Sequence, residues 1–171
     1  MKIRLFGTMQ DSIVDGPGLR YVVFVQGCLH HCLGCHNPKS HDIFGGYDDD
    51  TSHLLQEISD NPLLDGVTFS GGEPFLQCQP LIELAKKIKK NQLHLIIYSG
   101  YTFDEIMNLS DEARCLLSYC DTLIDGRFIQ EQKSLDLMYK GSKNQRIINV
   151  PLSLKNQKIV LQKINEYGEF V

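Results

Sequence analysis

Three cysteines within one short segment carry the clearest chemical signal in this sequence. Cys28, Cys32 and Cys35 stand at the spacing C-x3-C-x2-C in residues 27–37, which we call the cysteine loop. Thiolates grouped in this way are typical ligands of a metal ion or an iron–sulfur cluster. Three protein ligands leave one coordination position open, and an open position is where a metal centre does chemistry. The spacing therefore favours a reactive centre over a purely structural one.

Other polar and glycine-rich segments follow apolar runs elsewhere in the chain. Residues 71–74 read Gly-Gly-Glu-Pro, Ser99 precedes Gly100, and Asp125 precedes Gly126. Each segment, like the cysteine loop, comes directly after a short apolar run of the kind found in strands of a buried parallel sheet. Because the carboxyl ends of parallel strands meet at one edge of a sheet, we expect these segments and the three cysteines to surround one cavity.

The elements that must position these residues alternate along the chain. Apolar runs predict strands at residues 3–5, 21–25, 66–69, 93–98, 122–124 and 147–148. Capping residues and apolar spacings of three and four predict helices that begin near residues 51, 80, 103 and 111. This alternation predicts an α/β fold with a mostly parallel sheet. The last twenty residues predict no element.

Composition excludes several classes of function. The 171 residues carry a net charge of −4, which argues against nucleic-acid binding because phosphate contacts need a clustered basic surface. No apolar run approaches the roughly 20 residues of a membrane span, and the N-terminus does not read as a secretory signal, so we expect a cytoplasmic protein without membrane contact. Cysteines in that reducing compartment are more often ligands or buried thiols than disulfides. Cys78, Cys115 and Cys120 lack ligand spacing and are expected to be ordinary buried thiols.

The cysteine spacing after one buried strand, with Gly-Gly-Glu-Pro after the next, resembles the radical S-adenosylmethionine enzymes. The resemblance implies that Cys28, Cys32 and Cys35 bind three irons of a 4Fe-4S cluster, whose fourth iron binds S-adenosylmethionine. Cleavage of that cofactor by the reduced cluster gives a 5′-deoxyadenosyl radical in this family. The implied fold is a partial, open (β/α) barrel with mostly parallel strands, as one domain over residues 1–171 with a core at about 10–150.

The resemblance also implies the cofactor contacts. Residues 71–74 would lie along the methionine end of S-adenosylmethionine, where glycines allow close approach of the backbone. Gly34 stands where many family members carry an aromatic residue against adenine, which leaves adenine recognition to backbone groups and to His36. For Asp125, a role as a turn residue after its strand is the alternative. The expected cofactor-binding residues are Gly34, Cys35, His36, Gly71, Gly72, Glu73, Ser99 and Asp125.

Further segments narrow the resemblance to activases of glycyl radical enzymes. Residues 14–20, which include Asp-Gly-Pro-Gly, are similar to that group, although Asp15 could equally serve only the turn. Four segments resemble the branch that activates the anaerobic ribonucleotide reductase: residues 35–37, 98–101, 124–128 and 141–146. For Asn144, Gln145 and Arg146, only this resemblance favours a functional role over a solvated loop. The implied partners are the large subunit of that reductase, as protein substrate, and an electron donor such as flavodoxin.

Two other hypotheses remain open from the sequence. One keeps the radical chemistry but changes the substrate, to another glycyl radical enzyme or to a small molecule, as in deazaguanine biosynthesis. The other is a non-catalytic zinc module, because a Cys3His set is a common zinc site. Its fourth ligand would be one of the nearby histidines: His30, His31, His36 or His41.

Overall fold

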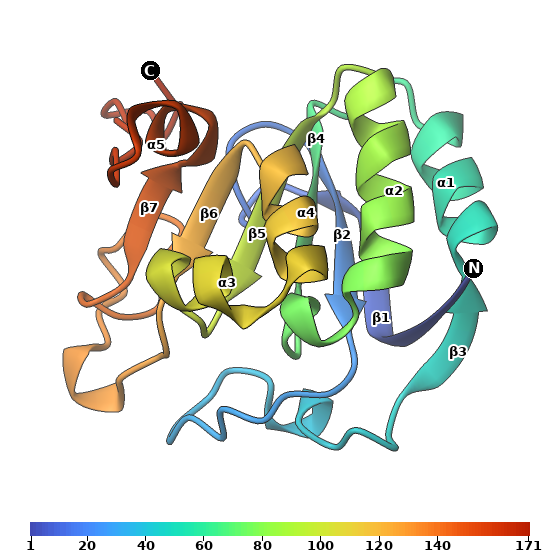
Figure 1. The fold of residues 1–171 in the computed structure, drawn as a ribbon, viewed down its shortest axis with the longest axis horizontal. Coiled ribbons are helices and arrows are strands. Elements are labelled where there is room, and N and C mark those ends of the chain that lie inside the picture. The colour runs from blue at the N-terminus through green and yellow to red at the C-terminus, as the bar shows by residue number, and fades with distance from the viewer.

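The computed structural model describes residues 1–171 and contains one seven-stranded sheet (Figure 1). The order of strands across the sheet is β3-β1-β2-β4-β5-β6-β7. The strands are β1 (Lys2–Ser12), β2 (Arg20–Val25), β3 (Tyr47–Asp50), β4 (Gly66–Gly71), β5 (His94–Ser99), β6 (Thr122–Asp125) and β7 (Arg146–Asn149). The four central strands, β2, β4, β5 and β6, run parallel, while β1, β3 and β7 join antiparallel. The sheet does not close, so the expected open α/β fold with parallel central strands is confirmed.

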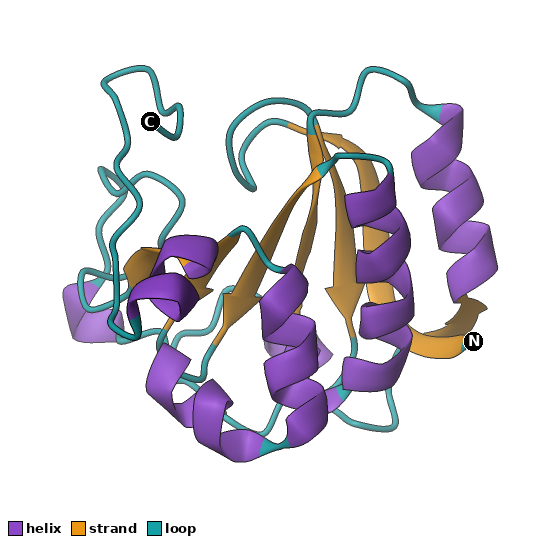
Figure 2. Cartoon of the chain, turned by 45° about the horizontal axis from the view of Figure 1, so that its top comes forward, coloured by secondary structure: helices purple, strands orange, loops and turns teal.

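Five α-helices connect and cover the strands. They are α1 (Thr51–Asp60), α2 (Cys78–Lys90), α3 (Phe103–Leu109), α4 (Asp111–Tyr119) and α5 (Val150–Asn156), with short 3-10 turns at Pro38–Ser40 (η1), Pro74–Leu76 (η2) and Gln130–Gln132 (η3). Figures 1 and 2 show α1, α2 and α4 packed side by side over one face of the sheet. No helix is long and apolar enough to cross a membrane.

Capping residues place the helix starts where the sequence predicts them. The Asp50 carboxylate accepts the Ser52 N–H at the start of α1, and Thr102 forms a capping box with Glu105 at the start of α3. Ser110 Oγ accepts the Ala113 N–H at the start of α4. Each side chain satisfies a backbone donor that has no partner inside the helix. The predicted starts of α1, α3 and α4 are therefore confirmed, and α2 begins at Cys78, near the predicted residue 80, without a side-chain cap.

The two faces of the sheet bury different clusters. The face under the helices carries the main core, with Val23, Phe69 and Ile97 at its centre. On the opposite face, Ile96, Ile124 and Ile147 form a smaller cluster, which side chains of the C-terminal segment, Ile164 and Phe170, partly cover. The alternation of side chains along each strand produces this division.

Three elements differ from the sequence prediction. The first strand runs from Lys2 to Ser12 rather than over residues 3–5, because β1 pairs with β2 through two register shifts that the local pattern does not reveal. The acidic strand β3 was not predicted, since aspartate is depleted in strands; Arg4 on β1 binds Asp48 and offsets its charge. Helix α5 was also missed, although Asn149 caps it and Pro151 stands in its first turn.

Candidate active site

The four parallel strands end in register at one edge of the sheet. Val25 pairs with Gly71, and Ser99 pairs with Asp125. The loops that follow these residues line a cavity of about 130 Å³. Its walls include the three loop cysteines and the glycines after β4 and β5, namely Cys28, Cys32, Cys35, Gly71, Gly72 and Gly100. The expected meeting of these segments around one cavity is confirmed.

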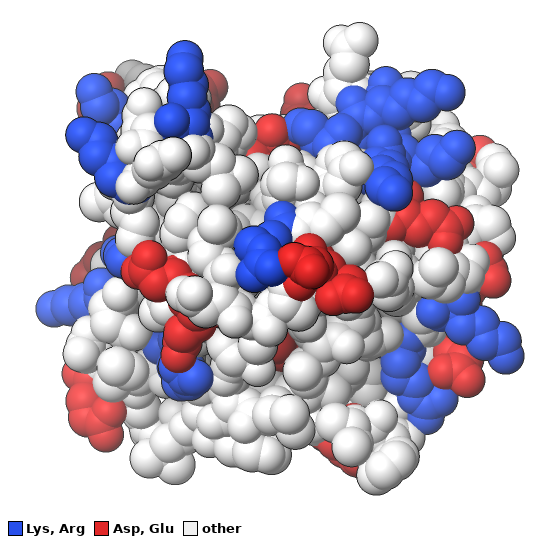
Figure 3. Space-filling model, in the orientation of Figure 1, with Lys and Arg blue, Asp and Glu red and all other residues white.

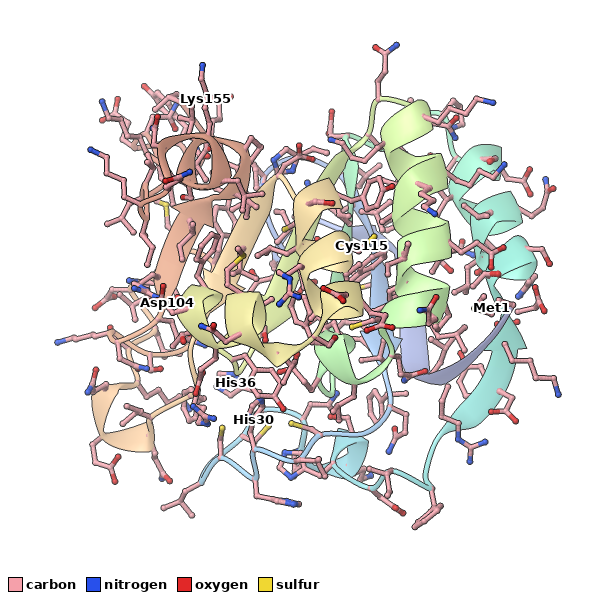
Figure 4. The ribbon with its side chains drawn as sticks, viewed as in Figure 1. Met1, His30, His36, Asp104, Cys115 and Lys155 are labelled. Carbon is pink, nitrogen blue, oxygen red and sulfur yellow. The ribbon has the colours of Figure 1, made fainter.

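The cysteine loop is anchored at its start. Gly27 donates its N–H to Ser40 O at 2.8 Å, and Cys28 donates its N–H to His41 O at 3.1 Å. The buried Gln26 side chain holds the returning chain, because its Nε2 donates to Lys39 O and Asp42 O. Figure 4 shows His30 and His36 on this loop, at the lower end of the sheet. The loop therefore leaves β2 in a defined direction.

The three loop thiols differ in burial, and none forms a disulfide. Cys28 is buried, whereas Cys32 and Cys35 are half-buried, and the Asn37 N–H donates to Cys35 Sγ at 3.4 Å. Burial raises the pKa of the Cys28 thiol, because a charged thiolate is poorly solvated there. The other three cysteines are also free: Cys120 is buried, and Cys78 and Cys115 are half-buried against the core, as expected.

The donor set is of a kind that can hold an iron–sulfur cluster. A zinc site needs four ligands at about 2.0–2.3 Å from one atom, whereas each thiolate of an iron–sulfur cluster binds its own iron. Here three free thiols lie around one cavity with a glycine-lined wall, so each thiolate could bind its own iron.

The two glycines of the Gly-Gly-Glu-Pro segment line the cavity, and they also leave room for the backbone at the start of the cysteine loop. A Cβ on Gly72 would lie 2.2 Å from Gly27 O, and a Cβ on Gly71 would lie 2.7 Å from the backbone of Val25. The Glu73 N–H donates to Gly27 O at 2.7 Å. Glycine is therefore required here by the close approach of two protein segments, a reason that the sequence alone did not reveal.

The Glu73 carboxylate binds protein donors from three segments. Its Oε1 accepts the Phe75 N–H at 3.0 Å and Ser99 Oγ–H at 2.9 Å. Its Oε2 accepts the Gly100 N–H at 2.9 Å and lies 2.8 Å from His30 Nε2. The side chain is only 1% exposed. The sequence suggests His30 only as one of four possible zinc ligands, because a separation of 43 positions between His30 and Glu73 leaves no local signal of their bond.

Asp125 is similarly engaged within the protein. One carboxylate oxygen accepts the Phe103 N–H at 2.7 Å, and both oxygens bind the Arg146 guanidinium. This hydrogen-bonded ion pair raises the pKa of Arg146. Since Ser99 Oγ also donates to Glu73, the side chains of Ser99, Glu73 and Asp125 all have protein partners. Their direct contact with a cofactor stays a prediction.

A second cavity of about 430 Å³ adjoins the first on the sheet face opposite the helices. His36 and Asp15 line it, and the His36 ring lies 4.9 Å from the Phe128 ring, centroid to centroid. Gly34 lines neither cavity and packs against Gln130. The residues common to both cavities are Cys35, Ser70, Gly71, Tyr98, Phe128 and Gln145.

The loop before β7 closes around the end of β6. Asn144 donates from Nδ2 to Arg127 O, and Gln145 donates from Nε2 to Gly126 O at 2.9 Å. Gln145 Oε1 accepts the Gly141 N–H at 2.8 Å. These bonds place Gln145 on the wall of both cavities, and a functional role for this loop stays a prediction.

Comparisons with known proteins agree with this arrangement. Residues 14–148 match the model of the family described as a 4Fe-4S single cluster domain. The anaerobic ribonucleoside-triphosphate reductase-activating protein of Haemophilus influenzae is 36% identical over 144 residues, covering 80% of this chain and 91% of the relative. Its counterpart in Vibrio cholerae is 34% identical over 149 residues, with the same coverage. The pyruvate formate-lyase-activating enzyme of Clostridium pasteurianum is 41% identical over 117 residues, which is 63% of this chain and 49% of that enzyme.

The matched region contains the cysteine loop, the Gly-Gly-Glu-Pro segment and the ends of β5 and β6. It therefore includes every wall of the smaller cavity. The match to the reductase-activating proteins extends over nearly their whole length, whereas the match to the formate-lyase activase spans about half of it. On this evidence the chain belongs to the 4Fe-4S single cluster domain family and, within it, to the anaerobic ribonucleoside-triphosphate reductase-activating proteins.

Proposed function

We propose that this protein is an activating enzyme that installs a glycyl radical on the large subunit of an anaerobic ribonucleotide reductase. The observation that carries the proposal is the convergence of three free thiols and two glycine-lined strand ends on one cavity. It occurs in a chain that aligns with reductase-activating proteins over 91% of their length. The chain would act as one radical S-adenosylmethionine domain over residues 1–171, with its core at about 10–150.

Cys28, Cys32 and Cys35 would hold the cluster, and Gly71, Gly72 and the end of β5 would hold S-adenosylmethionine beside it. A cluster bound and reduced there would supply the electron that cleaves S-adenosylmethionine to methionine and a 5′-deoxyadenosyl radical, and that radical would take a hydrogen atom from the Cα of a glycine in the reductase. The protein's own residues bring the thiols and the glycine edge to one cavity. A flavodoxin-type donor in the cytoplasm is the proposed source of the electron.

The open sheet supports a protein substrate. A closed (β/α) barrel usually needs about 250 residues, whereas this sheet stays open between β3 and β7. The larger cavity adjoins the cofactor cavity at Tyr98, Ser70 and Gly71, so a loop entering from that side could reach the cofactor. We propose that the fold is a partial barrel of the radical S-adenosylmethionine type and that the larger cavity admits the glycine-bearing loop.

The surface beside the cysteine loop also suits a protein partner. Figure 3 shows few charged side chains at the lower end of the molecule, where Figure 1 places this loop. Apolar side chains are exposed on the loop and just after it, at Leu29, Leu33, Ile43 and Phe44. Exposed apolar groups of this kind are typical of protein-binding surfaces.

A second candidate substrate is pyruvate formate-lyase, because activases of that enzyme also match this chain. Both candidates use the same site and differ in the protein that enters the larger cavity. The reductase is favoured because the match to its activating proteins covers nearly their whole length.

The test is anaerobic reconstitution of the cluster followed by addition of S-adenosylmethionine, a reductant and one candidate substrate. Electron paramagnetic resonance should detect a glycyl radical on the reductase. Absence of that signal with an intact, reducible cluster would refute the proposed target, and a signal on pyruvate formate-lyase alone would establish the second candidate. Zinc without iron or sulfide in the anaerobically purified protein would contradict both.

A further inference from the structure

Residues 29–36 of the cysteine loop have almost no hydrogen bonds to the rest of the protein. Within the loop, the Cys35 N–H donates to Cys32 O at 3.2 Å, which makes a local turn. The bond between His30 Nε2 and Glu73 Oε2, at 2.8 Å, is the only hydrogen bond that joins these eight residues to a residue outside the loop. His30 stands between two of the three thiols, so this bond acts directly on the segment that carries them.

The His30 ring is enclosed where it meets Glu73. Its side chain is only 6% exposed, although the residues on both sides of it are exposed. The ring packs edge-on against Tyr101, with centroids 4.4 Å apart and planes at 75°. A Cβ on Gly100 would lie 2.3 Å from the ring, so only glycine leaves room for it. The end of β5 is therefore shaped to receive this histidine.

The other hydrogen-bond partners of Glu73 show which atom donates and which accepts in its bond to His30. Two of the four groups on its carboxylate, the Phe75 and Gly100 N–H groups, can only donate, and the Ser99 hydroxyl donates to Oε1. A carboxylate that accepts from all of them accepts from His30 as well, so Nε2 carries the proton. With two donors on each oxygen, the carboxylate has its hydrogen-bonding capacity filled by protein. Glu73 thus joins the cysteine loop, the turn after β4 and the end of β5 at one point.

We propose that His30 is a positioning residue. Its bond to Glu73 holds the thiol-bearing loop against the ends of β4 and β5, and so sets the separation between the cluster ligands and the edge that binds S-adenosylmethionine. The second half of this statement rests on the proposed function. The first half concerns the protein alone and can be tested without iron.

Two substitutions separate the bond from the rest of the side chain. Glutamine carries an Nε2 donor at nearly the distance from the backbone at which histidine carries its own, so His30→Gln should retain the bond. Asparagine is one carbon shorter, and His30→Asn should lose it. The matched control is His31→Asn, on the exposed neighbour, whose φ of +48° is a conformation that asparagine adopts readily. Gly100→Ala tests the bond from the other side, because its Cβ must displace the His30 ring.

The first measurement uses iron-free protein under anaerobic conditions. Thermolysin cleaves before leucine, and the loop exposes Leu29 and Leu33. The initial rate of cleavage at these two sites should rise several-fold in His30→Asn and Gly100→Ala, because local opening becomes easier. It should remain near the wild-type rate in His30→Gln and His31→Asn. Equal rates in all five proteins would overturn the proposal.

The second measurement uses protein reconstituted with iron and sulfide. All variants should reach the wild-type iron content, because the three thiols are intact. The dissociation constant of S-adenosylmethionine, measured by equilibrium dialysis, should rise roughly tenfold in His30→Asn, as expected for loss of one hydrogen bond to a charged group, and little in His30→Gln. Unchanged affinity in His30→Asn would overturn the positioning role. A loaded wild-type protein that binds no S-adenosylmethionine would instead refute the proposed function, and the thermolysin rates would still decide whether His30 holds the loop.

Discussion

The cysteine loop and the Gly-Gly-Glu-Pro segment lie at the same edge of the sheet, yet the protein holds them in opposite ways. Residues 29–36 have one hydrogen bond to a residue outside the cysteine loop, and Leu29 and Leu33 are 59% and 74% exposed. In residues 71–74, Gly72 and Glu73 both donate backbone N–H groups to the segment around Gly27, and the Glu73 carboxylate is fully hydrogen-bonded.

This difference indicates that the two segments have different roles in the site. The segment after β4 is organised by protein contacts alone, so it presents a preformed edge. The position of the loop that carries the thiols depends on one hydrogen bond to that edge, from His30 to Glu73. With a cluster bound it also depends on the metal, because metal binding contributes the free energy that orders its ligands. Loss of a thiol from the loop should therefore affect cluster loading and activity, whereas changes in residues 71–74 should affect the stability of the whole fold.

The largest effect is expected from removing a ligand. Cys28→Ala, Cys32→Ala or Cys35→Ala should each abolish the glycyl radical signal and lower the iron content, because a thiolate that binds iron is lost. The melting temperature of the iron-free protein should change little for Cys32→Ala and Cys35→Ala, which are half-buried. Iron analysis, electron paramagnetic resonance and thermal unfolding measure the three outcomes.

Cys115→Ala is the control for this series, because its thiol packs beside the main core and lines no cavity at the site. It should load iron normally. A ligand variant that keeps both its iron content and its radical signal would show that the thiol in question is not a ligand.

In the other segment, Glu73→Ala should lower the free energy of unfolding of the iron-free protein by about 3 kcal/mol or more. Four donors would lose their acceptor, two of them fully buried, and each unsatisfied buried group costs about 1–3 kcal/mol. Urea unfolding followed by circular dichroism provides the measurement. Glu131→Gln, on an exposed carboxylate, should stay within about 0.5 kcal/mol of wild type. A Glu73→Ala protein as stable as that control would remove the contrast between the two segments.

Acid sensitivity should come from the opposite edge of the sheet rather than from either loop. Burial and the neighbouring Arg20 lower the pKa of His94, at the start of β5, from 6.5 to about 4, against a smaller opposing effect of Asp121. Below pH 6.5 His94 becomes protonated in the unfolded chain, whereas in the folded chain it stays neutral down to about pH 4. Stability should therefore fall over this window, by roughly 2–3 kcal/mol at about 1.4 kcal/mol per pH unit.

His94→Gln should flatten this dependence, because the substituted side chain does not titrate. Urea unfolding at several pH values between 7 and 4 compares the two proteins. His53→Gln serves as the control, since His53 is exposed and bonded to Asp49. The assignment fails if wild type and His94→Gln lose stability in parallel.

The smallest effect should come from the exposed apolar side chains of the cysteine loop. Leu33→Ser should change the free energy of unfolding by no more than about 0.5 kcal/mol. Phe75→Ala, in the turn directly after Gly-Gly-Glu-Pro, should lower it by about 3–5 kcal/mol, because Phe75 is buried in the main core. Similar losses for both variants in urea unfolding would mean that the loop supports the fold more than its contacts indicate.

Much of the fold could be predicted from the sequence, because the signals involved are local. Apolar spacing and capping side chains placed α1 to α4, and apolar runs placed the parallel strands. Strand β3 could not be found in this way, since three aspartates form a strand only when β1 offers them a partner. The length of β1 likewise depends on its pairing with β2. Helix α5 does carry local signals, the capping Asn149 and Pro151 in its first turn, but it is only seven residues long and shows no clear apolar spacing.

Within the site, the sequence by itself determined the chemistry: the spacing of three thiols, the glycines at the end of β4, and the alternation of strands and helices that predicts one shared edge. Only the tertiary structure decided how these parts are joined. In the folded protein, the Glu73 carboxylate accepts hydrogen bonds from protein donors, and Gly72 and Gly100 lie against the cysteine loop. His30 forms the one hydrogen bond that joins residues 29–36 to a residue outside this loop. The physical reason is that thiolate chemistry follows from residue type and spacing. A hydrogen bond across 43 residues exists only after the sheet has brought its two ends together.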